Sequence, residues 1–222
     1  MKKTIIASLF VLLGFTACDF LNEVPQDRLS PESYFKTETD LQLFTNPLYD
    51  NLLDKDAYEH QSDHCIHLNL SSELHGGTFR TVPATGGGWS WGNLRRINTL
   101  LGNSFNCENE SVRAHYDAVA RFFRAMFYFE KVKRFGDVPW IDVELGSESE
   151  QLFAPRDSRE LVMQNMIKDI DYAIANLPEK VSTFRVNKWA ALALKAEFCL
   201  YEGTFRKYHA GHVTLSTLPA DA

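Results

Sequence analysis

The sequence predicts an all-α protein made of antiparallel helix pairs joined by long irregular loops. Apolar residues recur three or four positions apart in five segments between residues 38 and 203, which is the spacing of one helix face. The only stretch that suggests a short strand is VPWIDVEL, at residues 138–145. A chain of 222 residues, 45% hydrophobic and 23% charged, is long enough to bury a substantial core.

The first residues have the layout of a secretory signal peptide. Lys2 and Lys3 precede an apolar run too short to span a bilayer, and small residues stand directly before Cys18. This pattern predicts a lipoprotein signal peptide over residues 1–17 and lipidation of the Cys18 thiol. The alternative is a plain secreted protein in which Cys18 has no special role. Cleavage before Cys18 would remove both lysines and change the net charge from −6 to −8. An acidic mature protein of this kind is a poor nucleic-acid binder.

Residues 18–37 contain two prolines and many polar side chains, so we expect an extended tether leading away from Cys18. Residues 38–53 then show helical spacing of leucine and phenylalanine, with Pro47 inside the pattern. Either a kinked helix or two short helices would accommodate this proline.

Residues 54–88 lose the periodicity and are expected to form a long loop. The loop contains a cluster with the residue types of a zinc site: His60, His64, Cys65 and His67, with His75 nearby. Because the spacing fits no standard pair of ligand motifs, we favour polar loop residues near a binding surface and predict no metal site.

The next two predicted helices cover residues 91–104, where Gly102 is placed to end the helix, and residues from Ser111 to about 135. The second has a wide apolar face formed by Val112, Tyr116, Val119, Phe122, Phe123, Met126, Phe127 and Phe129. Its last turn is basic, with Lys131, Lys133 and Arg134, which complements the negative end of the helix dipole. Gly136 and Pro139 should then stop the helix.

The last two predicted helices cover residues 157–178 and 187–203. The first opens with a pair resembling a capping box, Asp157 and Glu160, and should bury Met163, Ile167, Ile170, Ile174 and Leu177. The second should start at Asn187 as N-cap and end at Gly203. Alanines make it thin on one side, which favours close packing, and Cys199 is expected to be buried.

Five segments together resemble the landmarks of the SusD/RagB family. Ala125 and Phe129 already match an element of the tetratricopeptide consensus, and Pro178 follows a helix as its terminal proline would. The landmarks occur in family order and cover nearly all of residues 18–209: LNEVPQDRLSPESYF, WGNLRRIN, RAMFYFEKVKRFGDVPW, DIDYAIANLP and RVNKWAALALKAEFCLYEGTFRKYH.

The resemblance implies a non-catalytic outer-membrane lipoprotein, exposed at the cell surface and without a cofactor. Such a protein captures an oligosaccharide or another nutrient and hands it to a SusC-like TonB-dependent transporter, which docks on the tetratricopeptide-like side. Residues 38–209 would form a SusD-like N-terminal helical domain. Family members are more than twice as long, and residues 210–222 depart from the expected course, so we expect a truncated chain with an incomplete SusD-like fold and some uncovered apolar helix faces.

A ligand site is suggested by GGGWSWGN, where Trp89, Trp91 and Asn93 follow a triple glycine. Flat indole rings suit the apolar faces of sugars, and amide and guanidinium groups suit their hydroxyls. Similarity to starch-binding relatives implies that this cluster contacts glycan, together with Arg80. The alternative for both tryptophans is ordinary packing, with Trp91 starting a helix and turned into the core.

Catalysis has little support in the sequence. Asp137, Asp142 and Glu144 could be considered as paired carboxylates for glycoside hydrolysis, but Asp137 follows a helix end, where short polar residues serve the turn. No hydrolase, metalloprotease or phosphate-binding motif is present.

A Cys65 to Cys107 disulfide would be compatible with an oxidising compartment.

Two function classes therefore stay open. The favoured one is a glycan- or nutrient-binding lipoprotein that works with a transporter. The alternatives are a helical-repeat module for protein docking and a peptide-binding relative in the same family.

Overall fold

The computed structural model describes residues 33–52 and 86–209, and in these residues the chain is all α-helical, as the sequence predicts. The α-helices are α2 (Glu38–Leu52), α3 (Gly92–Asn103), α4 (Glu110–Phe135), α5 (Arg159–Asn176) and α6 (Lys188–His209). Two short 3₁₀ helices lie in connections, η3 (Ser104–Asn106) and η4 (Glu150–Phe153). The predicted strand at residues 138–145 is reduced to one antiparallel bridge, between Val138 and Asp157.

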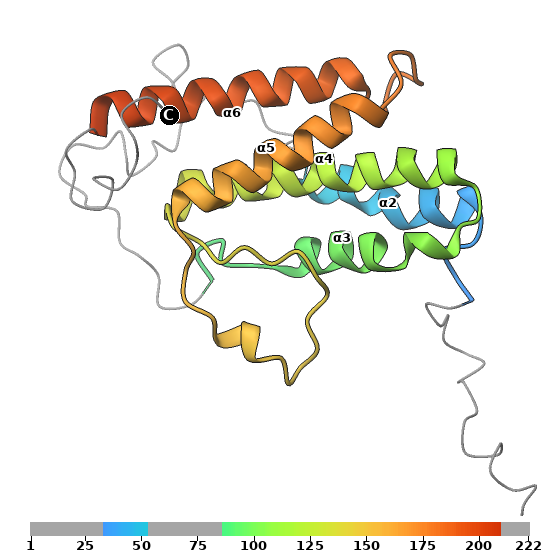
Figure 1. Cartoon of the computed structure of the whole chain (residues 1–222), viewed down its shortest axis with the longest axis horizontal. Helices are drawn as coiled ribbons and strands as arrows, with labels where there is room; N and C mark the ends of the chain where they lie inside the picture. Colours follow the sequence, from blue (N-terminus) through green and yellow to red (C-terminus); the bar gives the residue numbers. More distant parts are fainter. Residues whose placement is uncertain (1–32, 53–85, 210–222) are drawn as a thin grey trace, which may run out of the picture. The chain divides into compact units, whose positions relative to one another are not determined.

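The central helix of the described part is α4. It packs against α2, α3 and α5, and α5 packs in turn against α6 (Figure 1). Consecutive helices from α3 to α6 run in opposite directions, which confirms the predicted antiparallel arrangement. No helix in the described ranges combines the length and the apolar character needed to cross a bilayer.

The ends of α4 follow from local sequence. The side-chain oxygen of Asn109 accepts hydrogen bonds from the backbone N–H groups of Ser111 and Val112, which caps the first turn. Gly136 ends the helix with a φ of +71°, a backbone conformation that favours glycine. Because α4 has neighbours on several sides, most of its predicted wide face is buried, including Tyr116, Val119, Phe122, Phe123, Phe127 and Phe129. Of the residues predicted for this face, only Val112 and Met126 are half-buried.

The structure decides between the two alternatives for Pro47 and overturns two predicted helix ends. α2 continues through Pro47 as one helix, because Leu41 and Leu48 are fully buried on either side of it, each contributing about 2 kcal/mol. Gly102 and Gly203 both lie inside their helices. Neither has a positive φ, so neither acts as a helix terminator.

The start of α5 also differs from the prediction. Ser158, not Asp157, is the N-cap, and its side chain accepts from the backbone N–H of Leu161. Asp157 instead accepts a hydrogen bond from the backbone N–H of Trp140 at 2.7 Å. The N-cap of α6 is as predicted, since the side chain of Asn187 accepts from the backbone N–H of Ala190.

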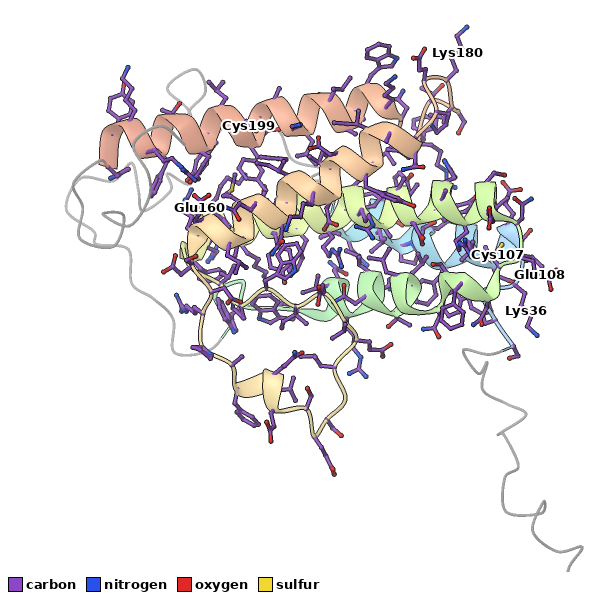
Figure 2. All side chains as sticks on the ribbon, in the orientation of Figure 1. Lys36, Cys107, Glu108, Glu160, Lys180 and Cys199 are labelled. Atoms are coloured by element: carbon purple, nitrogen blue, oxygen red, sulfur yellow. The ribbon has the colours of Figure 1, made fainter. Side chains whose placement is uncertain are left out.

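The buried faces of α5 and α6 are shifted from the prediction. In α5, Ile167 and Ile174 are only half-buried, and the core positions are Val162, Met163, Met166, Ile170 and Ala173. In α6, Cys199 is exposed rather than buried, as are Ala193 and Ala196 (Figure 2). Apolar side chains share that exposed surface, with Trp189 57% and Leu200 73% accessible. The predicted close packing of the alanines therefore holds for Ala191, which is fully buried, but not for Ala193 and Ala196.

A buried ion pair joins the helices to the segment between α4 and α5, residues 136–158. The Arg124 guanidinium on α4 donates to both carboxylate oxygens of Asp169 on α5, at 2.6 and 2.7 Å, and both side chains are almost fully buried. Arg124 also donates to the side-chain oxygen of Asn98 on α3 at 3.2 Å. Through these bonds one side chain links three helices.

Asn98 connects this network of bonds to segment 136–158. Its side-chain amide donates to the backbone carbonyls of Ile141 and Val143, each at 3.0 Å. Tyr128 of α4 adds a second attachment, because its hydroxyl accepts from the backbone N–H of Ile141 at 2.7 Å. Burial raises the pKa of Tyr128, so the hydroxyl stays protonated and can also donate to the carbonyl of Pro139. Segment 136–158 is thus held against α3 and α4 by its own backbone.

A second ion pair fixes α6 on α5. The Arg159 guanidinium donates to the Glu202 carboxylate at 2.8 Å, and both are buried. The Arg159 guanidinium also lies 3.9 Å from the centre of the Phe205 ring. These contacts lie on both sides of Gly203 and explain why α6 runs through that glycine to His209.

We predict that Asp169→Ala lowers the free energy of unfolding by about 3 to 5 kcal/mol, because it leaves the Arg124 charge buried without a partner. Urea denaturation followed by circular dichroism measures this change. Asp171→Ala is the matched control on the same helix, since Asp171 forms an exposed pair with Lys195 that should contribute less than about 1 kcal/mol. Equal effects of the two substitutions would contradict the prediction.

Candidate functional site

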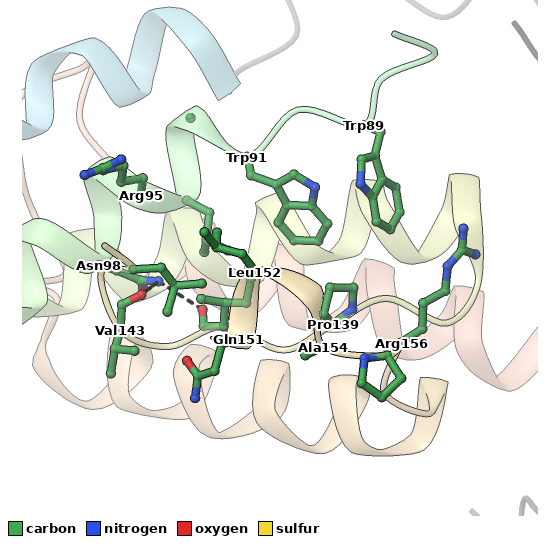
Figure 3. Close-up of a pocket in the computed structure, with 15 residues that line it drawn as sticks. Trp89, Trp91, Arg95, Asn98, Pro139, Val143, Gln151, Leu152, Ala154 and Arg156 are labelled. Atoms are coloured by element: carbon green, nitrogen blue, oxygen red, sulfur yellow. Dashed lines mark hydrogen bonds between the residues drawn. The ribbon is translucent and has the colours of Figure 1, made fainter. Parts of the chain in front are cut away.

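A cavity of about 620 Å³ opens between the start of α3 and segment 136–158 (Figure 3). One wall comes from the residues that lead into α3 and from its first turns: Trp89, Trp91, Gly92, Leu94, Arg95 and Asn98. The other wall comes from segment 136–158: Pro139, Ile141, Val143, Leu145, Gln151, Leu152, Ala154, Pro155 and Arg156. The lining is mainly apolar with a few polar groups, and its volume is in the range of small-molecule sites.

Three glycines shape the first wall. Gly86, Gly87 and Gly88 have φ values of +79°, +63° and +84°, which other residues rarely adopt. A Cβ atom on Gly88 would also lie 3.1 Å from Nε of Arg134, so the arginine side chain would have to shift slightly to admit a larger residue. The glycine run lets the chain turn so that Trp89 and Trp91 face the cavity.

A buried lysine holds this turn in place. Nζ of Lys131, in the last turns of α4, donates to the backbone carbonyl of Gly88. It also lies within 6 Å of the ring centres of Trp91, Phe127 and Phe135. Burial lowers the pKa of Lys131, and the neighbouring Arg134 guanidinium lowers it further. Lys131 therefore positions the glycine turn, a more specific role than the dipole complementarity predicted for the basic end of α4.

The two tryptophans combine packing with exposure to the cavity. Their rings meet edge to face, with centroids 5.0 Å apart. Trp91 stands just before α3, is half-buried and packs 5.7 Å from the Phe127 ring. Trp89 rests on Phe135 and remains 39% exposed. Trp91 thus starts α3, as expected of a packed aromatic, and both rings line the cavity.

Two arginines lie at opposite sides of the cavity in Figure 3. The Arg156 guanidinium stacks 5.0 Å from the centre of the Trp89 ring. Arg95 pairs with Glu144 at 3.2 Å, and Glu144 also accepts from the Thr99 hydroxyl at 2.6 Å. These exposed guanidinium groups and the Gln151 amide can bind hydroxyl or carboxylate groups at the edge of a ligand.

Two other residues were predicted for the glycan site, Asn93 and Arg80. Asn93 lies in the first turn of α3 but is not among the lining residues, and Arg80 lies outside the described residues. Segment 136–158 was not predicted as a wall. Gly136 and Pro139 were expected to end the preceding helix, and residues 138–145 suggested a short strand. No local signal showed that the segment folds back over α3, because the bonds that hold it there come from Asn98 and Tyr128.

Two of the three carboxylates considered for hydrolysis have structural partners. Asp137 accepts from the backbone N–H of Arg159 at 2.9 Å, and Glu144 is the partner of Arg95. The His60 to His67 cluster and Cys65 lie outside the described residues. No group of side chains suited to a metal ion occurs within the described ranges. Cys107 is a buried free thiol beside the start of α4, and its pairing with Cys65 stays a prediction (Figure 2).

Known proteins resemble this chain over most of its length. Residues 93–200 match a SusD-like family model described as starch-binding and associating with the outer membrane. SusD-like protein P2 of Formosa agariphila is 28% identical over 93% of this chain and 45% of its own length. A SusD-like protein of Bacteroides ovatus is 24% identical over 90% of this chain and 39% of its own length.

A solved structure shows the same fold. The crystal structure of a SusD-like protein from Bacteroides fragilis superimposes with a TM-score of 0.61 at 24% identity, over 83% of this chain and 39% of that chain. The chain therefore spans less than half the length of these relatives.

We predict that Lys131→Met loosens the tryptophan wall. The substitution leaves the Gly88 carbonyl without its donor, at a cost of about 1 to 3 kcal/mol in the free energy of unfolding. Acrylamide should quench the tryptophan fluorescence of Lys131→Met more strongly than that of the parent chain. Both are measured in a Trp189→Phe background, where the exposed indole of α6 no longer contributes. Lys168→Met, at an exposed position of α5, is the control. Quenching that stays at the control level in Lys131→Met would refute the positioning role.

Proposed function

Because the chain belongs to the SusD-like family, we propose that it is the glycan-capturing part of a non-catalytic protein that associates with the outer membrane. The observation that carries this proposal is the cavity walled by Trp89 and Trp91. A sugar ring placed on exposed indole has its apolar face covered, while groups at the rim bind its hydroxyls. No bond to the ligand is made or broken in this role.

The cavity suits capture followed by release. Trp89 is partly exposed and its ring is held by Phe135 and Arg156, so a stacking surface exists before ligand arrives and little side-chain ordering is needed on binding. The rim arginines are accessible to water, so their hydrogen bonds to a sugar exchange readily with solvent. This combination favours modest affinity, which a delivery protein needs. The receiver would be a SusC-like TonB-dependent transporter, with anchoring at the outer membrane through lipid on Cys18.

We predict that Trp89→Ala and Trp91→Ala each weaken oligosaccharide binding roughly tenfold, about 1.4 kcal/mol, by removing a stacking surface. Isothermal titration calorimetry with a panel of neutral oligosaccharides, starch fragments among them, measures the effect. Trp189→Ala is the matched control, since Trp189 is an exposed tryptophan on α6 that does not line the cavity. The proposal fails if no glycan binds, or if the α6 variant loses binding as strongly. Binding of a peptide panel instead of glycans would favour a peptide-binding relative.

Protein docking is the second candidate function, favoured by the exposed apolar side of α6. Trp189, Leu192 and Leu200 are accessible there beside small residues. Large exposed apolar groups of this kind mark interaction surfaces. Docking and glycan capture use different residues, so one chain can serve both.

We predict that Leu200→Asp reduces capture of a co-expressed SusC-like transporter at least severalfold in pull-down assays, because a charge is placed in an apolar contact. Oligosaccharide affinity should stay unchanged, since Leu200 does not line the cavity. Undiminished capture in Leu200→Asp would exclude α6 as the docking surface.

A further inference from the structure

A second, smaller cavity of about 210 Å³ lies where α2, α4 and the connection between α5 and α6 meet. It shares no residue with the tryptophan cavity. The side chains that matter here are Tyr49 of α2, His115 and Tyr116 of α4, and Ser182 and Arg185 of the connection. Most of its lining residues are polar, unlike the lining of the larger cavity.

Arg185 supplies a positive charge that no carboxylate neutralises within the described residues. Its guanidinium donates to the neutral side-chain oxygen of Asn46 at 2.7 Å and lies 4.9 Å from the centre of the Tyr49 ring. Arg124 and Arg159, by contrast, are each paired with a buried carboxylate. A guanidinium has five N–H donors, so Arg185 keeps donors for a further acceptor.

Hydroxyl groups surround that charge. Tyr116 is 6% exposed, lines the cavity, and its hydroxyl makes no hydrogen bond with any described residue. The Tyr49 hydroxyl accepts from the backbone N–H of Val186 at 3.3 Å, which leaves its own proton free to donate. Ser182 adds a third hydroxyl to the lining. A cluster of donors around one cation is suited to a ligand that carries acceptors and a negative charge.

The charge and size of the cavity limit that ligand. Burial lowers the pKa of His115, so the imidazole is mainly neutral at neutral pH. The negative charge of Glu38 acts on both His115 and Tyr116, which disfavours a multiply charged anion. A volume of 210 Å³ equals that of about seven water molecules, and is smaller than a drug-sized site. A single ring or a short chain would fill it.

We propose that this cavity binds a small, singly charged carboxylate that carries hydroxyl groups, with Arg185 as its anchor and Tyr116 as a second donor. A sugar acid has this chemistry, either free or as an acidic unit of a glycan. The carboxylate replaces water on the guanidinium, and the sugar hydroxyls meet Ser182 and the two tyrosines. This site is independent of the tryptophan cavity and of the proposed delivery function.

The test is a titration of the full chain with sodium glucuronate, followed by two-dimensional ¹H–¹⁵N NMR. We expect a dissociation constant on the order of 1 mM for a ligand of this size, with shifts in the amide signals of Ser182 and Val186. Arg185→Gln should weaken binding at least tenfold. Tyr116→Phe should weaken it severalfold without changing the melting temperature, because its hydroxyl makes no hydrogen bond with the part of the chain that the structure describes. Trp89→Ala should leave it unchanged.

Acetate and glucose complete the experiment. Binding of acetate as tight as that of glucuronate would support carboxylate recognition from any source, and tighter binding of glucuronate would support a sugar acid. Equal binding of glucose, unchanged binding in Arg185→Gln, or no shifts at all would overturn the proposal. If Arg185→Gln melts at a lower temperature than the parent chain, its loss of binding could come from unfolding, and the affinity of Tyr116→Phe is used instead. Unchanged affinity in Tyr116→Phe would then overturn the proposal.

Discussion

The buried pair between Arg124 and Asp169 is the interaction on which the described structure depends most. Both groups lie where water cannot solvate them, so each requires the other, and separating them would cost several kcal/mol. Such a pair does not stabilise a fold more than apolar packing would, but its two hydrogen bonds, with a third from Arg121 to Asp169 at 3.1 Å, hold α4 against α5. Asn98 extends that placement to α3, because its carbonyl oxygen receives Arg124 while its amide group holds two backbone carbonyls of segment 136–158.

The larger cavity is a consequence of this network. Segment 136–158 forms one wall, and its approach to α3 is set by Asn98 and Tyr128. The other wall depends on the last turns of α4, where Lys131 holds the glycine turn that carries Trp89. The long helix α4 thus supports both walls, through Tyr128 on one side and Lys131 on the other. A preformed site of this kind binds a ligand with little loss of conformational freedom.

Features set by local chemistry could be predicted from the sequence, and features set by distant partners could not. The periodicity located the five described α-helices but not the 3₁₀ helices η3 and η4, and Gly136 and Asn187 act where they were expected. The N-cap of α5 was predicted one residue too early, because the Asp157 carboxylate accepts a hydrogen bond from the backbone N–H of Trp140 and does not cap the helix. Trp89 and Trp91, predicted from glycines beside aromatic residues, line the cavity, and their contact with glycan stays a prediction. Arg156 and Gln151 were missed because they reach the cavity only after segment 136–158 folds back.

Hydrogen exchange of the backbone amide of Ile141 tests the central claim most directly. This amide donates to the Tyr128 hydroxyl, inside the region that Arg124 and Asn98 order. Asp169→Asn keeps the size of the side chain but removes its charge. We expect protection of Ile141 to fall in that variant by more than the protection of the Phe198 amide on α6, which reports global unfolding. Unchanged protection of Ile141 would show that segment 136–158 is held without the Arg124–Asp169 pair, and would contradict this account.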